Sequence, residues 1–123
     1  MDFRNWQTQL RKGLLEMVLM NLLGEGESHG YEMVRRLKQF KGLEIREGNV
    51  YPVLARLQMD GLVSTYTLAS TDGPQRKYYK LTRAGEQVLA RMNGHWDELA
   101  EGVEQTRSGG SKQWKIRTKS GKS

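Results

Sequence analysis

The chain has 123 residues, of which 37% are hydrophobic, and it contains no cysteine. This length supports one domain with at most a tail, and the lack of cysteine excludes a disulfide framework and a thiolate metal site. The first residues lack the apolar segment of a signal peptide. The longest apolar run, Leu14 to Leu23, is interrupted by Glu16 and Asn21 and is too short to span a bilayer. We therefore expect a soluble, cytoplasmic protein.

The net charge of +6 comes entirely from the end of the chain. Residues 1–106 hold 14 Lys and Arg against 14 Asp and Glu, whereas residues 107–123 hold six basic residues and no acid. Within the neutral part, positions 35–83 carry ten basic and four acidic residues, and positions 84–106 carry one basic and five acidic residues. A basic middle segment followed by an acidic helix fits a DNA-binding face that is separate from a partner-binding face. An unevenly charged, solvated surface is the alternative.

Two helices and a short strand are predicted in the first part of the chain. Apolar residues near the helical period predict a first helix from Trp6 to Leu23. Ser28 can cap a second helix, about His29 to Phe40, with Phe40 on its inner stripe. The alternation in Leu43–Ile45 predicts a very short strand.

A third helix is expected from about Glu47 to Asp60, with its apolar residues turned inward. Gly61 can adopt the left-handed conformation that ends a helix, and Leu62 supplies the hydrophobic contact that often follows. Pro52 is unfavourable inside a helix, and Arg46 has no capping oxygen. The sequence therefore specifies the start of this helix weakly.

The remaining elements are a hairpin and a long helix. Val63–Leu68 and Arg76–Leu81 are predicted strands, and residues 69–75 between them form the predicted loop, or wing. Thr82 caps a last helix that runs to about Thr106 and that we expect to continue across Gly94. Its apolar residues are spaced like a coiled-coil seam. They are Leu89, Met92, Trp96, Leu99 and Val103.

This order of elements predicts an α+β, mostly helical protein. Residues 1–81 would form a winged helix-turn-helix DNA-binding domain that includes the N-terminal helix. Residues 82–106 would form a C-terminal dimerisation helix. Residues 107–123, rich in Ser, Gly and Lys, would form a basic, disordered tail.

In a winged helix, the N-terminal residues of the third helix enter the major groove. Asn49 can pair with adenine, Arg56 can reach guanine or a phosphate, and Tyr51 can donate a hydrogen bond to a phosphate. Arg56 could equally be a solvated helix residue, and Tyr31 could equally belong to the core. The predicted DNA-contacting residues are His29, Tyr31, Asn49, Tyr51, Arg56, Gln75, Arg76 and Lys77.

The residues do not support an enzyme. His29 and His95 are the only histidines, too few for a structural zinc site without cysteine. Lys122-Ser123 imitates the end of a phosphate-binding loop, but Ile116 stands where its first glycine is required. We expect no catalytic residue, no metal and no cofactor.

Three motifs stand out along the chain. They are Gly30-Tyr31-Glu32, then Gly48-x-x-Tyr51-Pro52-x-Leu54-x-Arg56-Leu57 with Asp60-Gly61-Leu62, and Arg76-Lys77-Tyr78-Tyr79-x-Leu81-Thr82 with Gly85. Together they resemble the short members of the PadR family of bacterial transcriptional regulators, over residues of about 10–106. Arg46-Glu47 departs from the Ser-Pro that the family often has, the loop before Arg76 differs, and the basic tail is not part of the family pattern.

The resemblance implies a homodimeric repressor that binds a dyad-symmetric operator and is released by a small aromatic or drug-like ligand. It also implies that the last helix packs against the partner's first helix, with Trp96 beside a ligand pocket or simply part of the packing. The residues expected at this dimer interface and pocket are Phe3, Trp6, Leu10, Met92, Trp96, Leu99 and Val103. The alternative is a protein-interaction module that keeps the winged-helix fold without sequence-specific DNA binding.

Overall fold

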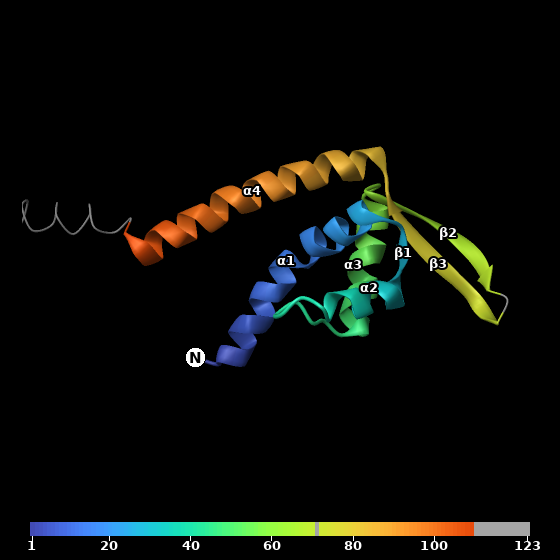
Figure 1. The fold of residues 1–123 in the computed structure, drawn as a ribbon, viewed down its shortest axis with the longest axis horizontal. Coiled ribbons are helices and arrows are strands. Elements are labelled where there is room, and N and C mark those ends of the chain that lie inside the picture. Colours follow the sequence, from blue (N-terminus) through green and yellow to red (C-terminus); the bar gives the residue numbers. More distant parts are fainter. Residues whose placement is uncertain (71, 110–123) are drawn as a thin grey trace, which may run out of the picture. The chain divides into compact units, whose positions relative to one another are not determined.

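The computed structural model describes residues 1–70 and 72–109. It contains the helices α1 (Phe3–Glu25), α2 (Gly30–Leu37), α3 (Glu47–Met59) and α4 (Arg83–Ser108), and the strands β1 (Ser28–His29), β2 (Val63–Ser70) and β3 (Gly73–Leu81) (Figure 1). The chain divides into two compact units, residues 1–90 and residue 91 onward. The first unit therefore holds α1 to α3, the sheet and the start of α4.

The core of the first unit is an apolar cluster contributed by all three helices. Asp2 caps α1 by accepting a hydrogen bond from the Asn5 amide at 3.2 Å. From Leu15 onward, α1 is buried on the side that packs against α3 and β3. The most completely buried side chains of this core are Leu19, Met20, Met33, Leu37, Val50, Leu54 and Leu57.

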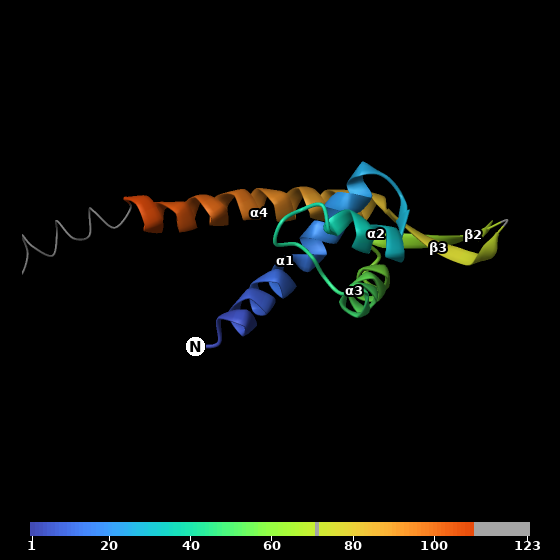
Figure 2. The same cartoon turned by 60° about the horizontal axis from the view of Figure 1, so that its bottom comes forward.

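The sheet is antiparallel, with the strand order β1-β3-β2. Its long hairpin extends away from the three helices of the first unit, as the two views show (Figures 1 and 2). The strands are longer than the sequence predicts, because Ser70 already pairs with Gly73. Most of the predicted wing loop is therefore strand.

Three expectations for the segment before α3 are wrong. Ser28 does not cap α2, because it is buried in β1 and its neighbour His29 accepts the Glu32 amide hydrogen bond at 3.1 Å. Residues 43–46 adopt no regular secondary structure, and the short strand is β1 instead. α2 ends at Leu37, so Phe40 lies beyond the helix and is exposed.

The expected ends of α3 and the start of α4 are confirmed. Gly61 has a left-handed backbone with φ of 76°, and the Leu62 amide donates to the Leu57 carbonyl at 2.9 Å. Arg46 makes no side-chain cap, and Pro52 lies inside the helix. The Thr82 hydroxyl oxygen accepts a hydrogen bond from the Gly85 amide at 3.0 Å, and α4 continues across Gly94 as expected.

Within the described residues, no helix is both long and apolar enough to cross a membrane. The same residues bring together no group of three or more His, Cys, Asp or Glu that could hold a metal ion. The predicted disordered tail lies outside the described residues except for its first positions, where Arg107 and Ser108 belong to α4.

Candidate nucleic-acid interface

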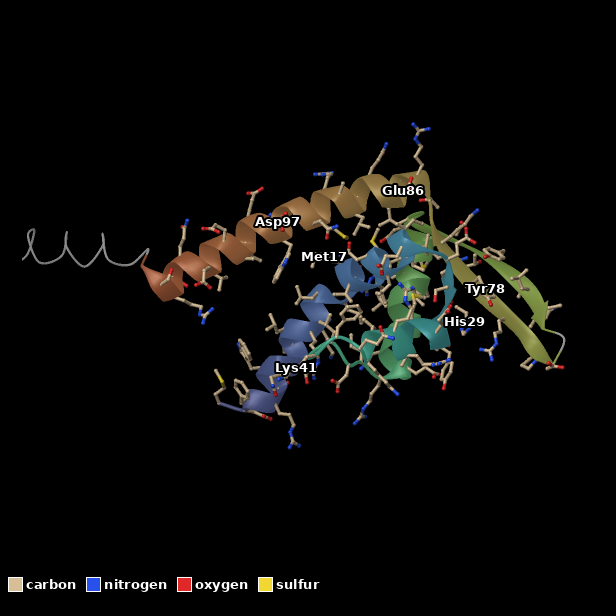
Figure 3. The ribbon with its side chains drawn as sticks, viewed as in Figure 1. Met17, His29, Lys41, Tyr78, Glu86 and Asp97 are labelled. Carbon is tan, nitrogen blue, oxygen red and sulfur yellow. The ribbon has the colours of Figure 1, made fainter. Side chains whose placement is uncertain are left out.

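The N-terminus of α2 is joined to the wing by a row of aromatic rings. His29 pairs with Tyr78 in the sheet, and its ring meets the Tyr78 ring edge-on at 5.3 Å (Figure 3). Tyr66, opposite Tyr78 on β2, stacks on it at 5.5 Å. The Tyr66 hydroxyl donates to the Glu27 carboxylate, which raises the pKa of Tyr66. These contacts hold the base of the wing against the start of α2.

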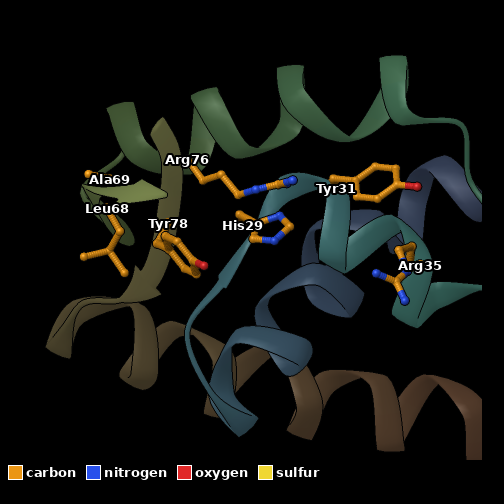
Figure 4. A pocket seen from close by; sticks show the side chains of 7 residues that line it. All are labelled: His29, Tyr31, Arg35, Leu68, Ala69, Arg76 and Tyr78. Carbon is orange, nitrogen blue, oxygen red and sulfur yellow. The ribbon is translucent and has the colours of Figure 1, made fainter. Parts of the chain in front are cut away.

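Two adjoining hollows, which share His29, Tyr31 and Arg76, lie between α2, α3 and the wing. We call them together the wing-side hollow. Figure 4 shows Arg76 extending from β3 towards the side of His29 and Tyr31. The charged residues that line it are Arg35, Arg76 and Lys77, and no Asp or Glu is among the described lining residues. The hollow is therefore positively charged.

Tyr51 forms the α3 side of the wing-side hollow. Its ring packs so tightly on Gly30 that a Cβ at this glycine would lie 2.4 Å from a ring carbon. Burial raises the pKa of Tyr51, and Glu47 adds to this effect while Arg76 opposes it. Tyr51 is still 39% exposed. With its raised pKa, the exposed phenol stays protonated at neutral pH and can donate a hydrogen bond to an anion.

Tyr31 is 47% exposed, so the alternative that it belongs to the core is wrong. The Arg35 guanidinium lies 5.9 Å from the centre of its ring, in a cation–π contact. Arg35 is absent from the predicted site, although its position four residues after Tyr31 on one helix is a signal that could have found it. Tyr78 was missed too, and it follows Arg76 by two positions on the same face of β3.

Six of the eight predicted DNA-contacting residues meet at the wing-side hollow. They are His29, Tyr31, Tyr51, Gln75, Arg76 and Lys77.

The remaining two, Asn49 and Arg56, lie on the side of α3 that faces α1. Asn49 lines a separate hollow with residues of α1. The Arg56 guanidinium forms an ion pair with Glu16 of α1 at 3.3 Å. Arg56 is thus an exposed helix residue, as the alternative expected, paired with Glu16 and not part of the wing-side group.

The family model of the PadR-like transcriptional regulators matches residues 19–91. A solved PadR-like transcription factor from Bacteroides fragilis is 41% identical and has a TM-score of 0.70, with 83% of this chain and 98% of the other covered. A PadR-like regulator from Bacillus cereus is 32% identical and has a TM-score of 0.74, with 82% and 98% covered. A transcriptional regulator of Mycobacterium tuberculosis is 27% identical over 77% of this chain and 87% of its own.

These matches and the described fold agree with the resemblance of the sequence. The three-stranded antiparallel sheet with its helices is the winged-helix arrangement of the PadR-family structures. The related proteins are named transcriptional regulators and not enzymes. The chain belongs to the PadR-like family and is a DNA-binding transcriptional regulator.

Proposed function

We propose that the protein is a homodimeric repressor that binds a dyad-symmetric operator through α3 and the wing. The observation that carries this proposal is that six predicted contact residues meet at the wing-side hollow. Two of the six are cations, Arg35 adds a third, and no acid is among the described lining residues. Cations and hydroxyl donors at the edge of a groove-binding helix suit the phosphate backbone.

The exposed surface of α3 suits the reading of bases. Asn49 lies on one side of the helix and Tyr51 on the other, with the exposed Pro52 and Ala55 between them. An Asn side chain can pair bidentately with adenine, and small apolar groups suit the methyl group of thymine. We therefore assign sequence recognition to Asn49 and backbone contacts to Tyr51, Arg76 and Lys77.

Exposed apolar stripes support the homodimer. Near the start of α1, Phe3 and Trp6 stack at 5.5 Å, and Phe3 is 61% exposed. On α4, Trp96, Leu99 and Val103 are exposed as well. Burial of apolar surface is favourable by about 25 cal/mol per Å², so a second copy of the chain that covers these stripes gains stability. A two-fold dimer presents two copies of α3 to a dyad-symmetric site.

A ligand site at this interface is the second part of the proposal. Trp96 supplies a planar ring, and Met92 supplies a flexible, polarisable side chain that adapts to different shapes. In the proposed dimer, Leu99 and Val103 of one copy and Phe3, Trp6 and Leu10 of the other would supply the rest of the apolar surface. A small aromatic ligand that binds the dimer in only one arrangement shifts the population towards that arrangement and so changes operator affinity.

The experiment is a gel-shift titration with the duplex upstream of the protein's own gene. We expect a discrete complex of two chains per site that survives an excess of scrambled duplex, and weaker binding by Arg76→Ala. A promoter fusion should then be more active when the protein is absent. A complex that scrambled duplex removes as readily as operator would favour the interaction module that lacks sequence-specific DNA binding.

A further inference from the structure

The hollow on the α1 side of α3 is strongly basic. Four cations line it: Arg4, Arg11 and Lys12 from α1, and Arg46 just before α3. Glu44 is the acid that lines it. We call this group, together with Asn49, the α1-side hollow. The composition of the chain does not reveal it, because residues 1–106 are neutral in sum.

The four cations are available to a ligand. The ion pairs within the described residues join Arg36 to Glu25, Arg56 to Glu16 and Arg107 to Glu104. None of the four lining cations takes part in these pairs. Several cations and a single acid around one hollow create a positive potential that attracts an anion.

The face of α1 that carries the cations is separate from its apolar stripe. Arg4 and Arg11 are seven residues apart, so they lie on one face of the helix with Thr8 between them. Phe3, Trp6 and Leu10 fall on the other side by the same helical spacing. A second copy that covers the apolar stripe therefore leaves the cations free to bind another partner.

The two hollows flank α3. Tyr51 belongs to the wing-side hollow and Asn49 to the α1-side hollow, and residues two apart on a helix point in nearly opposite directions. An α-helix is about 10–12 Å wide with its side chains. The major groove of B-DNA is about 12 Å wide. A helix in that groove is therefore bordered by a phosphate backbone on each side.

We propose that the α1-side hollow binds the phosphate backbone of one DNA strand while the wing-side hollow binds the other, so that α3 is held in the groove from both sides. This inference rests on the proposed DNA-binding function and adds Arg4, Arg11, Lys12 and Arg46 to the residues that perform it. Phosphate contacts hold a protein in register without reading sequence. The α1-side cations thus add affinity on the Asn49 side of α3 without reading bases themselves.

The test uses the full chain and compares two pairs of substitutions. Lys12→Gln with Arg46→Gln removes two exposed cations from the α1-side hollow, and Arg83→Gln with Arg91→Gln removes two exposed cations that line neither hollow. Operator affinity is measured at several salt concentrations. Each phosphate that the protein no longer neutralises should reduce the magnitude of the slope of log K against log salt by about 0.9.

For the variant with Lys12→Gln and Arg46→Gln, we expect a smaller magnitude of the slope of log K against log salt. Its preference for the operator over point-mutated operators should not change. The Arg83 and Arg91 pair should keep the slope of the unsubstituted protein. Glu44→Gln, which removes the acid of the hollow, should raise affinity. Equal slopes for both pairs, with specific binding intact, would overturn the inference while the proposed function stands.

Ethylation interference locates the contacts on the DNA. The unsubstituted protein should show two clusters of sensitive phosphates in each half-site, one on each strand across the major groove. The Lys12 and Arg46 pair should lose one cluster and Arg76→Ala should lose the other. A single cluster, removed by the wing substitution alone, would overturn the inference. Absence of any specific complex would overturn the proposed function together with it.

Discussion

At the residue scale, Asn49 and Arg56 illustrate how a shared helix face can lead to different roles. Both lie on the side of α3 next to α1, but Arg56 is held by Glu16 at 3.3 Å. The Asn49 side chain makes no hydrogen bond to the part of the chain that the structure describes. Its side-chain amide is therefore available to hydrogen-bond a base, whereas Arg56 can contact DNA only after its ion pair with Glu16 is broken.

We predict that Asn49→Ala alters sequence preference. Removal of one base contact should cost about 1–3 kcal/mol on the operator and less on operators already mutated at the contacted base. Arg76→Ala and Lys77→Ala serve as controls, because phosphate contacts weaken all sequences alike. Competition among point-mutated operators provides the measurement. An equal reduction of affinity on every sequence for Asn49→Ala would contradict the assignment.

At the element scale, the junction between β3 and α4 is fixed by close contacts. The Thr82 amide donates to the Leu62 carbonyl at 3.0 Å, and the Thr82 hydroxyl donates to the Gly61 carbonyl at 2.7 Å. A Cβ at Gly85 would lie 2.0 Å from the same Leu62 oxygen, whereas a Cβ at Gly94 would meet nothing within 4 Å. The two glycines of α4 therefore have different roles.

We predict that Gly85→Ala lowers the free energy of unfolding by about 1–3 kcal/mol, because backbone atoms must move to admit the methyl group. Gly94→Ala should instead raise it by about 0.5–1 kcal/mol, since alanine favours a helix interior. Urea denaturation followed by circular dichroism compares the two variants. If Gly85→Ala proves as stable as the unsubstituted protein, the close contact with Leu62 is not maintained in solution.

The elements differ in how far the sequence could predict them. α1, α3 and α4 have apolar periodicity and local end signals, so their existence and most of their ends were predictable. β1 was not predictable, because its two residues become a strand only by pairing with Tyr78 and Tyr79, about fifty positions later. The cap of α2 was mispredicted for the same reason. The local sequence favours Ser28, but pairing in β1 buries Ser28, and His29 caps the helix instead.

The candidate site was predictable in part. The wing-side residues carry local motifs, such as Gln75-Arg76-Lys77, and they come together as expected. Arg46 lies more than thirty residues after the three cations of α1 and meets them through the packing of α1 against α3. No local pattern joins residues so far apart in the sequence.

At the scale of the whole molecule, Trp96 tests the ligand proposal. We predict that Trp96→Ala remains a dimer by sedimentation but that planar aromatic compounds no longer quench its tryptophan fluorescence. Trp6 and Trp114 still provide a signal in that variant. Trp114→Phe is the matched control and should keep the quenching. Trp96 would be merely a packing residue if the Trp96→Ala variant sediments as a monomer. The same conclusion would follow if no planar aromatic compound quenches the fluorescence of the unsubstituted protein.

The charge distribution leads to the most direct test of DNA binding. Residues 1–106 have no net charge, so we expect their attraction for DNA to come from locally basic surface, above all the two hollows that flank α3. The decisive measurement is operator affinity as a function of salt concentration. For a dimer that contacts about 6–10 phosphates, we predict that affinity falls by a factor of about 10³–10⁵ between about 50 and 200 mM salt. An affinity that stays constant over this range would contradict the account.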